Sequence, residues 1–353
     1  MTQPEGPLWQ EFLTVSARIG LDIGLVQGAG GNSSLKDGRI MWIKASGNWL
    51  AAADTHPIMV PVDLAALRER VMASELAETD IAATTLSGGP AGMRASVETP
   101  FHALLPGRCV LHVHCVDTIA AAIRVDAADL LHDRLAGLNW RWQPYVKPGV
   151  PLTNALRDSG AAEADLIVLG NHGLIAQADT PAAAEALLSQ VRERLGGPVP
   201  SRRAAPGGAW PSLAGTGYSV ARVPDGNDLM FWPELRAHAG NCVIAPDFVV
   251  FFGPSIPILT PGPDLPRRLC ALAEAQLPQN AIVLVEGLGA LIRADAMRGT
   301  EELLSGFVHV LKRHVMNGGG PMRRLDPAEI AELLNWDAEK YRQAMNRGPD
   351  GTG

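Results

Sequence analysis

Two histidines separated by one residue are the strongest candidates for chemistry in this sequence. His112 and His114 lie in an apolar run that begins at Cys109 and has the pattern of a buried strand. Because side chains alternate between the two faces of a strand, residues two apart project from the same face. Two imidazoles on one face can bind one zinc ion at about 2.0–2.1 Å each. The alternative is a pair of core histidines satisfied by hydrogen bonds.

A third histidine strengthens the metal-site hypothesis. His172 lies in a glycine-flanked turn after the predicted buried strand 166–169, where a side chain can point across a cleft. A catalytic zinc ion takes three protein ligands and keeps one position open. The three histidines match this number, although sequence spacing does not show that they converge.

Glu98 is the candidate acid or base of the same site. It opens a short helix predicted over residues 98–105, with His102 one turn later on the same face. A carboxylate beside a metal ion serves as a ligand, as a general acid or base, or as both in turn. The alternative is an ordinary first-turn glutamate stabilised by the helix dipole. We interpret His102 as a supporting or structural residue.

Two glycine-rich segments are candidates for anion binding. Residues 28–34 (GAGGNSS) offer backbone N–H groups together with the side chains of Asn32, Ser33 and Ser34 as donors, and residues 44–47 (KASG) add the charge of Lys44. Neither segment matches a P-loop or a dinucleotide-binding fingerprint. Plain turns are therefore the alternative for both.

An α/β fold in two parts is predicted to position these residues. The sequence indicates a metal-binding catalytic domain over residues 1–197, a linker rich in Gly, Pro and Ser over 198–224, and a second α/β domain over 225–353. Within the first domain, the segment 27–34 is predicted to be a loop. The run after Pro181 is predicted to be a helix, because its apolar residues recur at helical spacing.

The second part has its own pattern of elements. Apolar runs predict strands at 248–252 and 281–285, and apolar periodicity predicts a helix over about 301–314. A capping box that begins at Asp326 predicts a last helix through Tyr341.

Two segments of the chain resemble each other. Residues 167–175 (IVLGNHGLI) and 282–292 (IVLVEGLGALI) are each followed by Ala-Asp and a predicted helix, and their alignment places Gly289 opposite His172. One interpretation is that the second half is a degenerate copy of the first that has lost its metal ligand. The other is that one α/β protein contains two similar strand–turn–strand–helix units.

Composition and charge exclude several classes of protein. The formal net charge of −7 argues against a nucleic-acid partner bound through its phosphates. No apolar stretch approaches the roughly 18 residues that cross a bilayer, and residues 1–20 indicate an amphipathic helix rather than a signal peptide. The four cysteines lack CxxC spacing and are interpreted as buried small hydrophobic residues in a reducing compartment. These features predict a soluble cytoplasmic protein that binds a small molecule.

These motifs, in this order, resemble the class II aldolase/adducin family, in particular its fuculose- and rhamnulose-phosphate aldolases. The similarity covers roughly residues 8–195 and rests on six motifs: GGNSS (30–34), KASG (44–47), SVETPFH (96–102), HVH (112–114), PYVKPG (144–149) and NHG (171–173). Residues 242–342 more loosely resemble the region that follows these motifs in long rhamnulose-phosphate aldolase-like proteins. The resemblance implies an α/β/α sandwich around a mostly antiparallel sheet, followed by a C-terminal α/β extension.

The resemblance also implies roles for the site residues. It implies a Zn²⁺ ion, or another divalent metal, held by His112, His114 and His172. Glu98 matches the glutamate that approaches the metal at rest and serves as acid and base once substrate arrives. The residues that match phosphate-holding positions are Gly31, Asn32, Ser46, Gly47 and Ser96, and Lys44 is a further candidate for contact with the substrate.

Three departures from the family pattern limit this assignment. Phosphate-binding members often have two adjacent serines before the acid, whereas this chain has Ser96 and Val97. One hydroxyl donor to a phosphate is therefore missing. A substrate with a carboxylate that contacts Lys44, in place of a phosphate, is the alternative. Members that epimerise a pentulose phosphate have aspartate where this chain has Glu98. The tyrosine that aldolases take from a neighbouring subunit has no convincing match, so the proton donor to the leaving aldehyde stays unassigned.

The resemblance implies a zinc-dependent lyase that cleaves a ketose phosphate or a related sugar acid by a retro-aldol reaction. As a Lewis acid, zinc in this family stabilises the enediolate left when the carbon–carbon bond breaks. The alternatives are decarboxylation of a 3-oxo sugar acid phosphate, dehydration of a sugar phosphate and, outside enzymes, an adducin-like binding module. Because active sites of the family lie between adjacent subunits, a homo-oligomer, dimer or tetramer, is expected.

Overall fold

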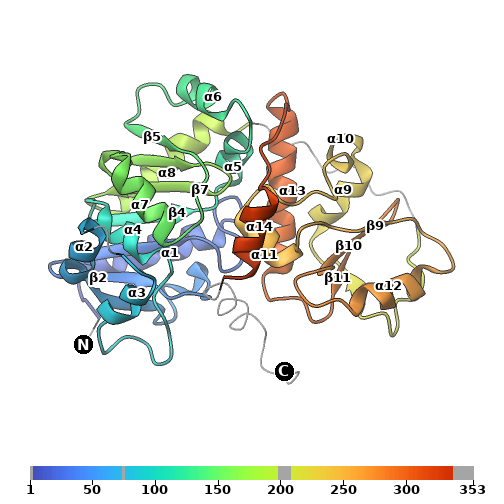
Figure 1. The fold of residues 1–353 in the computed structure, drawn as a ribbon, viewed down its shortest axis with the longest axis horizontal. Coiled ribbons are helices and arrows are strands. Elements are labelled where there is room, and N and C mark those ends of the chain that lie inside the picture. The colour runs from blue at the N-terminus through green and yellow to red at the C-terminus, as the bar shows by residue number, and fades with distance from the viewer. Residues whose placement is uncertain (1–2, 74–75, 198–207, 337–353) are drawn as a thin grey trace. The chain divides into compact units, whose positions relative to one another are not determined.

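The chain forms two compact units. The computed structural model describes residues 3–73, 76–197 and 208–336. Unit 1 comprises Met1–Ala122 with Asp126–Gly196, and unit 2 comprises Ile123–Val125 with Gly197–Gly353. In Figure 1 unit 1 runs from blue to yellow-green and unit 2 from yellow to red.

A seven-stranded sheet forms the centre of unit 1. Its strand order is β3-β2-β1-β4-β7-β6-β5, and every pair of neighbours is antiparallel except β5 and β6, which are parallel. The strands are β1 (Asn32–Asp37), β2 (Ile40–Lys44), β3 (Met59–Asp63), β4 (Cys109–Val113), β5 (Trp140–Gln143), β6 (Leu166–Leu169) and β7 (Gly173–Ala178). The predicted mostly antiparallel sheet is confirmed.

Helices cover both faces of this sheet. The helices are α1 (Pro7–Leu21), α2 (Leu64–Met72), α3 (Thr79–Thr84), α4 (Thr99–Leu104), α5 (Val116–Ala122), α6 (Ala127–Arg134), α7 (Val150–Asp158) and α8 (Pro181–Leu195), with short 3-10 turns at Leu50–Ala52 and Ala161–Glu163. Residues of α1, α5, α6 and α8 pack with Leu111, whereas residues of α4 and α7 pack with Val110. Because Val110 and Leu111 are neighbours on β4, the two helical layers lie on opposite faces. The predicted α/β/α sandwich is confirmed.

Local sequence signals fix the starts of two helices. The Asp63 carboxylate accepts a hydrogen bond from the N–H of Ala66 at 3.0 Å, which caps α2. The Thr180 hydroxyl accepts one from the N–H of Ala183 at 3.2 Å, and Pro181 occupies the first turn of α8. The helix predicted after Pro181 is confirmed.

Lys36 is buried inside unit 1, although lysine side chains are ordinarily charged and exposed. The residue is only 6% exposed, and its Nζ donates to the carbonyl oxygens of Leu105 and Gly107 at 2.5 Å each. Burial, and secondarily the charge of Arg68, lower the pKa of this amine to about 7. Lys36 is therefore mostly neutral in the folded protein above that pH.

We expect the buried Lys36 to make unfolding depend on pH. In the unfolded chain its pKa returns to about 10.4. Between pH 7 and that value the unfolded chain binds more protons at this residue, so its contribution to the free energy of unfolding rises with pH. The stability of wild type minus that of Lys36→Met should increase by up to about 1.4 kcal/mol per pH unit over this range. Urea denaturation of both proteins at several pH values measures this difference, and a constant difference would contradict the lowered pKa.

Unit 2 contains a smaller sheet. Its four strands have the order β8-β11-β10-β9. The strands are β8 (Tyr218–Val220), β9 (Ile258–Leu259), β10 (Ile282–Val285) and β11 (Gly289–Arg293). The helices are α9 (Asp228–Phe231), α10 (Pro233–Arg236), α11 (Pro246–Phe252), α12 (Leu265–Ala273), α13 (Thr300–Met316) and α14 (Pro327–Leu334), with a 3-10 turn at Pro224–Asn227. The predicted α/β extension is confirmed.

The sheet of unit 2 repeats four of the seven strands of the sheet of unit 1. In chain order, β8, β9, β10 and β11 take the places of β4, β5, β6 and β7; β9–β10 is parallel like β5–β6, and the other neighbours are antiparallel. The hairpin turns also have equal length, because Leu169 pairs with Gly173 and Val285 pairs with Gly289. This agreement favours the degenerate-copy interpretation over two unrelated strand–turn–strand units.

The hairpin register corrects the predicted alignment of the two segments. Asn171 and Gly287 occupy the same place in the two turns, and both have a positive φ, of 52° and 69°. Leu288 therefore stands at the place of His172, and the prediction of Gly289 is wrong. The sequence alignment was off by one position, because the apolar residues before and after the two turns are similar. The copy lacks the histidine in either case.

Three predictions about unit 2 are changed by the structure. The predicted strand at 248–252 is wrong, because these residues belong to helix α11, in which Phe248 and Phe252 stack at 5.7 Å. A short, continuously apolar run does not distinguish a buried strand from a buried helix. The predicted linker contains strand β8. The capping box at Asp326 is confirmed, but α14 ends at Leu334 and Tyr341 lies outside the described residues.

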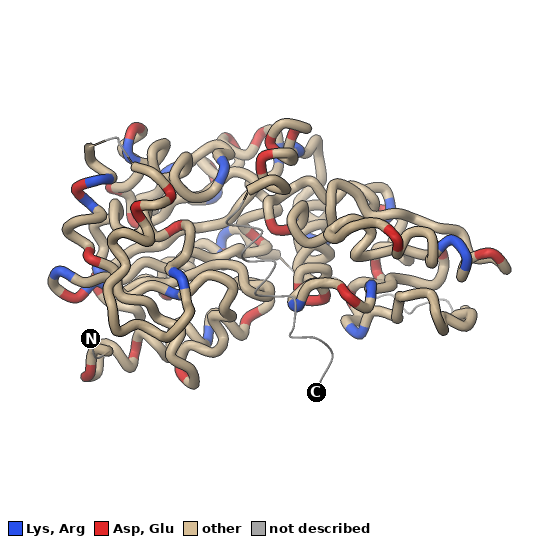
Figure 2. Tube along the Cα trace, turned by 60° about the horizontal axis from the view of Figure 1, so that its bottom comes forward, with Lys and Arg blue, Asp and Glu red and all other residues tan. Residues whose placement is uncertain are grey.

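The surface features agree in part with the predictions from composition. Basic and acidic residues are interspersed along both units in the view of Figure 2. Within the part of the chain that the structure describes, no helix is long and apolar enough to cross a membrane. Cys109, Cys115 and Cys242 are buried as predicted, whereas Cys270 is exposed. On α12 the buried Leu265 and Leu269 occupy the inner face, so Cys270, which follows Leu269, points outward.

Candidate metal centre and active site

The pairing of β4 with β7 brings the three candidate histidines together. His112 lies opposite Ile175, and Val113 lies opposite Leu174, so the end of β4 adjoins the turn that carries His172. His112 and His172 have ring centroids 4.8 Å apart, and His114 lies 5.1 and 5.2 Å from them. One ligand nitrogen from each of the three rings falls within 4.8 Å of the others. The convergence that spacing alone did not show is present in the structure.

The cluster is buried and one of its rings is held in a fixed orientation. His112, His114 and His172 are 0%, 7% and 5% exposed. His112 Nδ1 lies 3.2 Å from the carbonyl oxygen of Leu174. A carbonyl only accepts, so Nδ1 carries the proton and Nε2 keeps its lone pair for a metal ion.

Glu98 faces the three histidines from the N-terminal end of helix α4. Its Oε2 lies 3.4 Å from His112 Nε2, and its Oε1 lies 3.6 Å from His172 Nε2. The residue is 6% exposed and stands at the N-cap of α4, where it does not cap the helix with its side chain. Its carboxylate is therefore directed to the histidines and not to its own helix, which is the position expected of a ligand or an acid/base.

Hydrogen bonds connect Glu98 to two predicted site residues. Asn32 Nδ2 donates to Glu98 Oε2 at 2.7 Å and approaches Ser96 Oγ at 3.3 Å. Asn32 is opposite His112 in the β1–β4 pairing, so both project from one face of the sheet. Residues 32–34 were predicted to be loop but belong to β1; pairing with β4 forms a strand from residues of low strand propensity.

His102 lies behind Asn32. The residue is fully buried, with Nδ1 2.8 Å from Ser34 Oγ and Nε2 hydrogen-bonded to Asn32 Oδ1. Burial, and secondarily the nearby His112 and Lys36, hold the pKa of His102 well below its ordinary value. His102 is therefore neutral at physiological pH.

Gly31 allows β1 to begin close to the metal-binding strand. Its φ is +58°, a conformation that favours glycine, and a Cβ at this position would lie 2.7 Å from the carbonyl oxygen of His112. The glycine-rich segment thus brings Asn32 to the strand that carries His112.

The second predicted anion-binding segment joins the first through Lys44. Lys44 Nζ donates to the carbonyl oxygens of Ala29 at 2.9 Å and Asn48 at 2.7 Å. The residue is 2% exposed. Its ammonium group thus ties the glycine-rich loop to the turn that contains Ser46 and Gly47. The structure supports a role of Lys44 in holding the two loops together.

Ser46 and Gly47 come directly after Ala45, which contacts the segment that leads to Glu98. Ala45 pairs with Ala95, and the N–H of Ser46 donates to the carbonyl oxygen of Arg94 at 2.9 Å. Ser96, which lies next in this segment, accepts from the N–H of Glu98 at 3.3 Å. The turn that carries Ser46 and Gly47 therefore packs against the segment that leads to Ser96 and Glu98.

A family assignment comes from the sequence of unit 1. Residues 10–195 match the family of class II aldolase and adducin N-terminal domains. The chain belongs to this family. The match spans unit 1 and contains every candidate site residue.

Similarity to other proteins is confined to about half of the chain. A Bacillus subtilis protein named uncharacterized oxidoreductase YuxG is 30% identical over 186 residues, which is 48% of this chain. The match covers only 26% of that relative's length. Solved structures with a similar fold include the N-terminal class II aldolase domain of a Thermoplasma acidophilum protein (24% identity, 55% of this chain and 94% of that one, TM-score 0.48) and L-fuculose-1-phosphate aldolase from Thermus thermophilus (18% identity, 52% and 92%, TM-score 0.34).

Gly173 keeps the aldolase domain's histidine turn against β4. A Cβ at Gly173 would lie 2.3 Å from the carbonyl oxygen of Val113 and 3.4 Å from His112 Cε1. We expect Gly173→Ala to push the turn away from β4, which destabilises the protein by roughly 1–3 kcal/mol and lowers zinc affinity. Isothermal titration with zinc and urea denaturation measure the two effects.

Gly197→Ala is the matched control for this substitution. A Cβ at Gly197 has its nearest neighbouring atom at 3.8 Å, which is an ordinary contact. Wild-type zinc affinity in Gly173→Ala would contradict the close packing of the turn.

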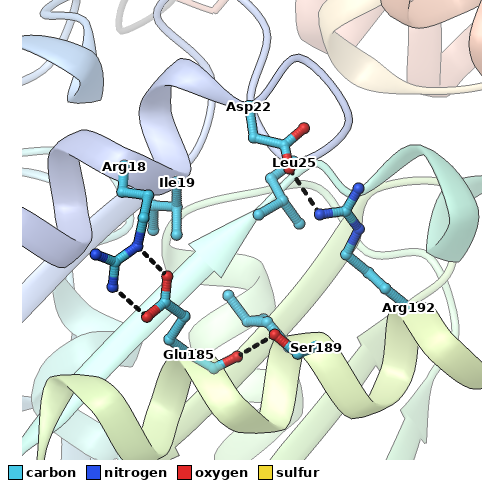
Figure 3. Close-up of a pocket in the computed structure, with 8 residues that line it drawn as sticks. Arg18, Ile19, Asp22, Leu25, Glu185, Ser189 and Arg192 are labelled. Atoms are coloured by element: carbon cyan, nitrogen blue, oxygen red, sulfur yellow. Dashed lines mark hydrogen bonds and ion pairs between the residues drawn. The ribbon is translucent and has the colours of Figure 1, made fainter.

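A small surface pocket of the aldolase domain lies away from the candidate site residues. It has a volume of about 190 Å³ and is lined by α1, α8 and the residues after α1. Arg18 bonds to Glu185 and Arg192 bonds to Asp22, as Figure 3 shows. Each pair joins a residue of α8 to α1 or to the residue that follows it, so these ion pairs hold α8 against the α1 region.

Two groups that orient the site have contacts that the sequence did not predict. Ser34 was predicted as a donor to an anion, whereas its hydroxyl contacts His102. The Leu174 carbonyl, which contacts His112, was not predicted at all. The Leu174 carbonyl had no signal in the sequence, since its position depends on the register of β4 with β7.

Proposed function

We propose that the protein is a divalent-metal-dependent lyase that cleaves a ketose phosphate, or a related sugar acid, by a retro-aldol reaction. The observation that carries this proposal is the position of Glu98, whose two carboxylate oxygens face the Nε2 atoms of His112 and His172 at 3.4 and 3.6 Å. A binding module has no evident need for a buried carboxylate opposite three converging imidazoles. The family to which the chain belongs agrees with this proposal.

The donor set fits a divalent metal such as Zn²⁺. Three imidazoles with an adjacent carboxylate are the ligand chemistry of catalytic zinc sites. Glu98 Oε1 is buried and accepts no hydrogen bond from any described residue, which suits a group that faces a cation. His112, His114 and His172 would hold the metal, and when bound it supplies a Lewis acid for the substrate's carbonyl oxygen.

Glu98 is the proposed acid and base of the reaction. In the cleavage direction a base takes the proton of the hydroxyl that becomes the aldehyde, and the bond between this carbon and the three-carbon fragment breaks. The protonated carboxyl group of Glu98 then gives its proton to the carbon that has lost the bond. In the direction of synthesis its carboxylate removes that proton. Burial of the site excludes water, which protects the reactive fragment from other protonation.

The loops around Glu98 are the proposed contacts for the substrate's anionic group. Support comes from the meeting of the segments that carry Gly31, Asn32, Ser46, Gly47 and Ser96, which are tied together by Lys44 and the Ala45–Ala95 pair. We also propose a homo-oligomer, because aldolases of this family complete their sites between subunits. The cytoplasm is the proposed location.

A substrate panel tests the proposed reaction. The zinc-loaded protein is incubated with ketulose 1-phosphates of five and six carbons, and release of dihydroxyacetone phosphate and an aldehyde is followed by enzyme-coupled assay. The expected result is release of both products in equal amounts with at least one ketose phosphate. Release of CO₂ from a 3-oxo sugar acid phosphate, with no cleavage of any ketose phosphate, would overturn the aldolase proposal in favour of a decarboxylase.

A further inference from the structure

A row of four buried polar side chains leads from the core of unit 1 to Glu98. Ser34 contacts His102 at 2.8 Å, His102 contacts Asn32, and Asn32 Nδ2 donates to Glu98 Oε2 at 2.7 Å. Ser34 and His102 are fully buried, and Asn32 and Glu98 are 3% and 6% exposed. Each member of the row therefore depends on its neighbours for hydrogen bonds.

The atoms of this row determine its hydrogen-bond directions. A carboxylate only accepts, so Asn32 must turn its NH₂ group to Glu98 and its Oδ1 to His102. Oδ1 also only accepts, so His102 Nε2 carries a proton and donates it. In a neutral imidazole Nδ1 then accepts, and it does so from the Ser34 hydroxyl. All bonds run in one direction, from Ser34 to Glu98.

Two structural elements are linked by this row. Asn32 and Ser34 are two residues apart on β1 and share one face of the strand. Glu98 and His102 are four residues apart at the start and the middle of α4. His102 spans the gap between the two strand side chains, so the carboxylate of Glu98 and the strand beside His112 are held in one arrangement.

We propose that His102 is a positioning residue that fixes the Asn32 amide, and through it directs the Glu98 carboxylate toward His112 and His172. This inference rests on the proposed function. Without the donor at His102 Nε2, the buried Asn32 Oδ1 loses its hydrogen-bond partner, so the amide is no longer held in one orientation. The hydrogen bond from Asn32 Nδ2 then fixes the Glu98 carboxylate less tightly, and Glu98 spends less time in the position from which it reaches the substrate.

The experiment compares His102→Phe with His102→Gln in the metal-loaded 353-residue chain. Phenylalanine removes both ring nitrogens, whereas the amide NH₂ of glutamine can again donate to Asn32 Oδ1. The first readout is exchange of the carbon-bound proton of dihydroxyacetone phosphate in D₂O, which needs Glu98 but no aldehyde. We expect kcat for exchange to fall about 10- to 100-fold in His102→Phe with KM little changed, and to recover in His102→Gln.

A second readout does not depend on activity. The three imidazoles are loaded with Co²⁺, whose visible d–d absorption responds to the carboxylate beside them. We expect His102→Phe to change this absorption and His102→Gln to restore it. His132→Phe, on the exposed part of α6, is the matched control and should leave both readouts unchanged.

Asn32→Asp covers the case in which His102→Phe does not fold. Aspartate has nearly the shape of asparagine and still accepts from His102, but in its ionised form it cannot donate to Glu98 and repels it. We expect it to lower kcat and to change the Co²⁺ absorption as His102→Phe does. A folded His102→Phe or Asn32→Asp protein with wild-type exchange and wild-type absorption would overturn the inference, as would a loss that His102→Gln does not recover.

The two proposals fail in different ways. If wild type binds Co²⁺ but exchanges no proton of dihydroxyacetone phosphate, the proposed function is contradicted for this three-carbon product. The Co²⁺ absorption of the variants then decides on the role of His102. If exchange occurs in wild type and the variants equal it, the function stands and the positioning role is wrong.

Discussion

Glu98→Gln is expected to abolish proton transfer while the protein keeps its metal. Glutamine has the shape of glutamate and can still accept from Asn32 Nδ2, so the hydrogen-bonded row remains. It neither takes up nor gives a proton, so kcat should fall by about 10²–10⁴-fold. Exchange of the carbon-bound proton of dihydroxyacetone phosphate in D₂O measures kcat, and elemental analysis measures the metal.

Glu185→Gln is the matched control for this change. Glu185 belongs to the same domain, but its partner is Arg18 in the surface pocket and not the histidine cluster. An ion pair of this exposed kind contributes little to stability. Activity of Glu98→Gln within about threefold of the Glu185→Gln protein would remove Glu98 from its proposed role, since general acid–base catalysis contributes far more than that.

His172→Ala is expected to remove most of the stabilisation that bound zinc gives to the aldolase domain. A metal that binds only the folded protein stabilises it by about 2.7 kcal/mol at a hundred times Kd. For a domain of this size, that corresponds to a rise in Tm of roughly 5–10 °C. His172 supplies one of three ligands, so the variant should lose most of this rise. Thermal unfolding with and without zinc measures it.

His132→Ala provides the comparison for the loss of one histidine. His132 is an exposed residue on α6 and is not part of the cluster. Its zinc-induced rise in Tm should equal that of wild type. An equal rise in His172→Ala would mean that zinc stabilises the protein at another place.

The identity of the site residues could be predicted from the sequence, but their convergence could not. The alternation of a strand places His112 and His114 on one face, and this needs no tertiary information. The approach of His172 depends on the pairing of β4 with β7, residues of which are about sixty positions apart in the chain. Only the resemblance to a family suggested it before the structure did.

The role of Lys44 illustrates another limit of the sequence. A lysine next to a glycine-rich turn suggests contact with an anion, which stays a prediction for this residue. The structure shows that its Nζ donates to two backbone carbonyls. Carbonyl groups are present at every residue, so the sequence contains no sign of which ones a buried lysine will meet.

The fold of unit 1 was easier to predict than the fold of unit 2. Two of its helices begin at side-chain caps, Asp63 and Thr180, which act locally. In unit 2 the run 248–252 is apolar at every position, so neither period is visible and the helix was mistaken for a strand. The repeat of four strands became clear only from their order and direction.

The metal content of the purified protein tests the central claim most directly. Elemental analysis of wild type, after incubation with zinc and removal of the excess, measures ions bound per chain. The three converging imidazoles predict about one zinc ion per chain at high affinity, as for catalytic zinc sites. Absence of bound zinc, and of any other divalent metal offered in its place, would contradict the metal site and with it the lyase mechanism proposed for this protein.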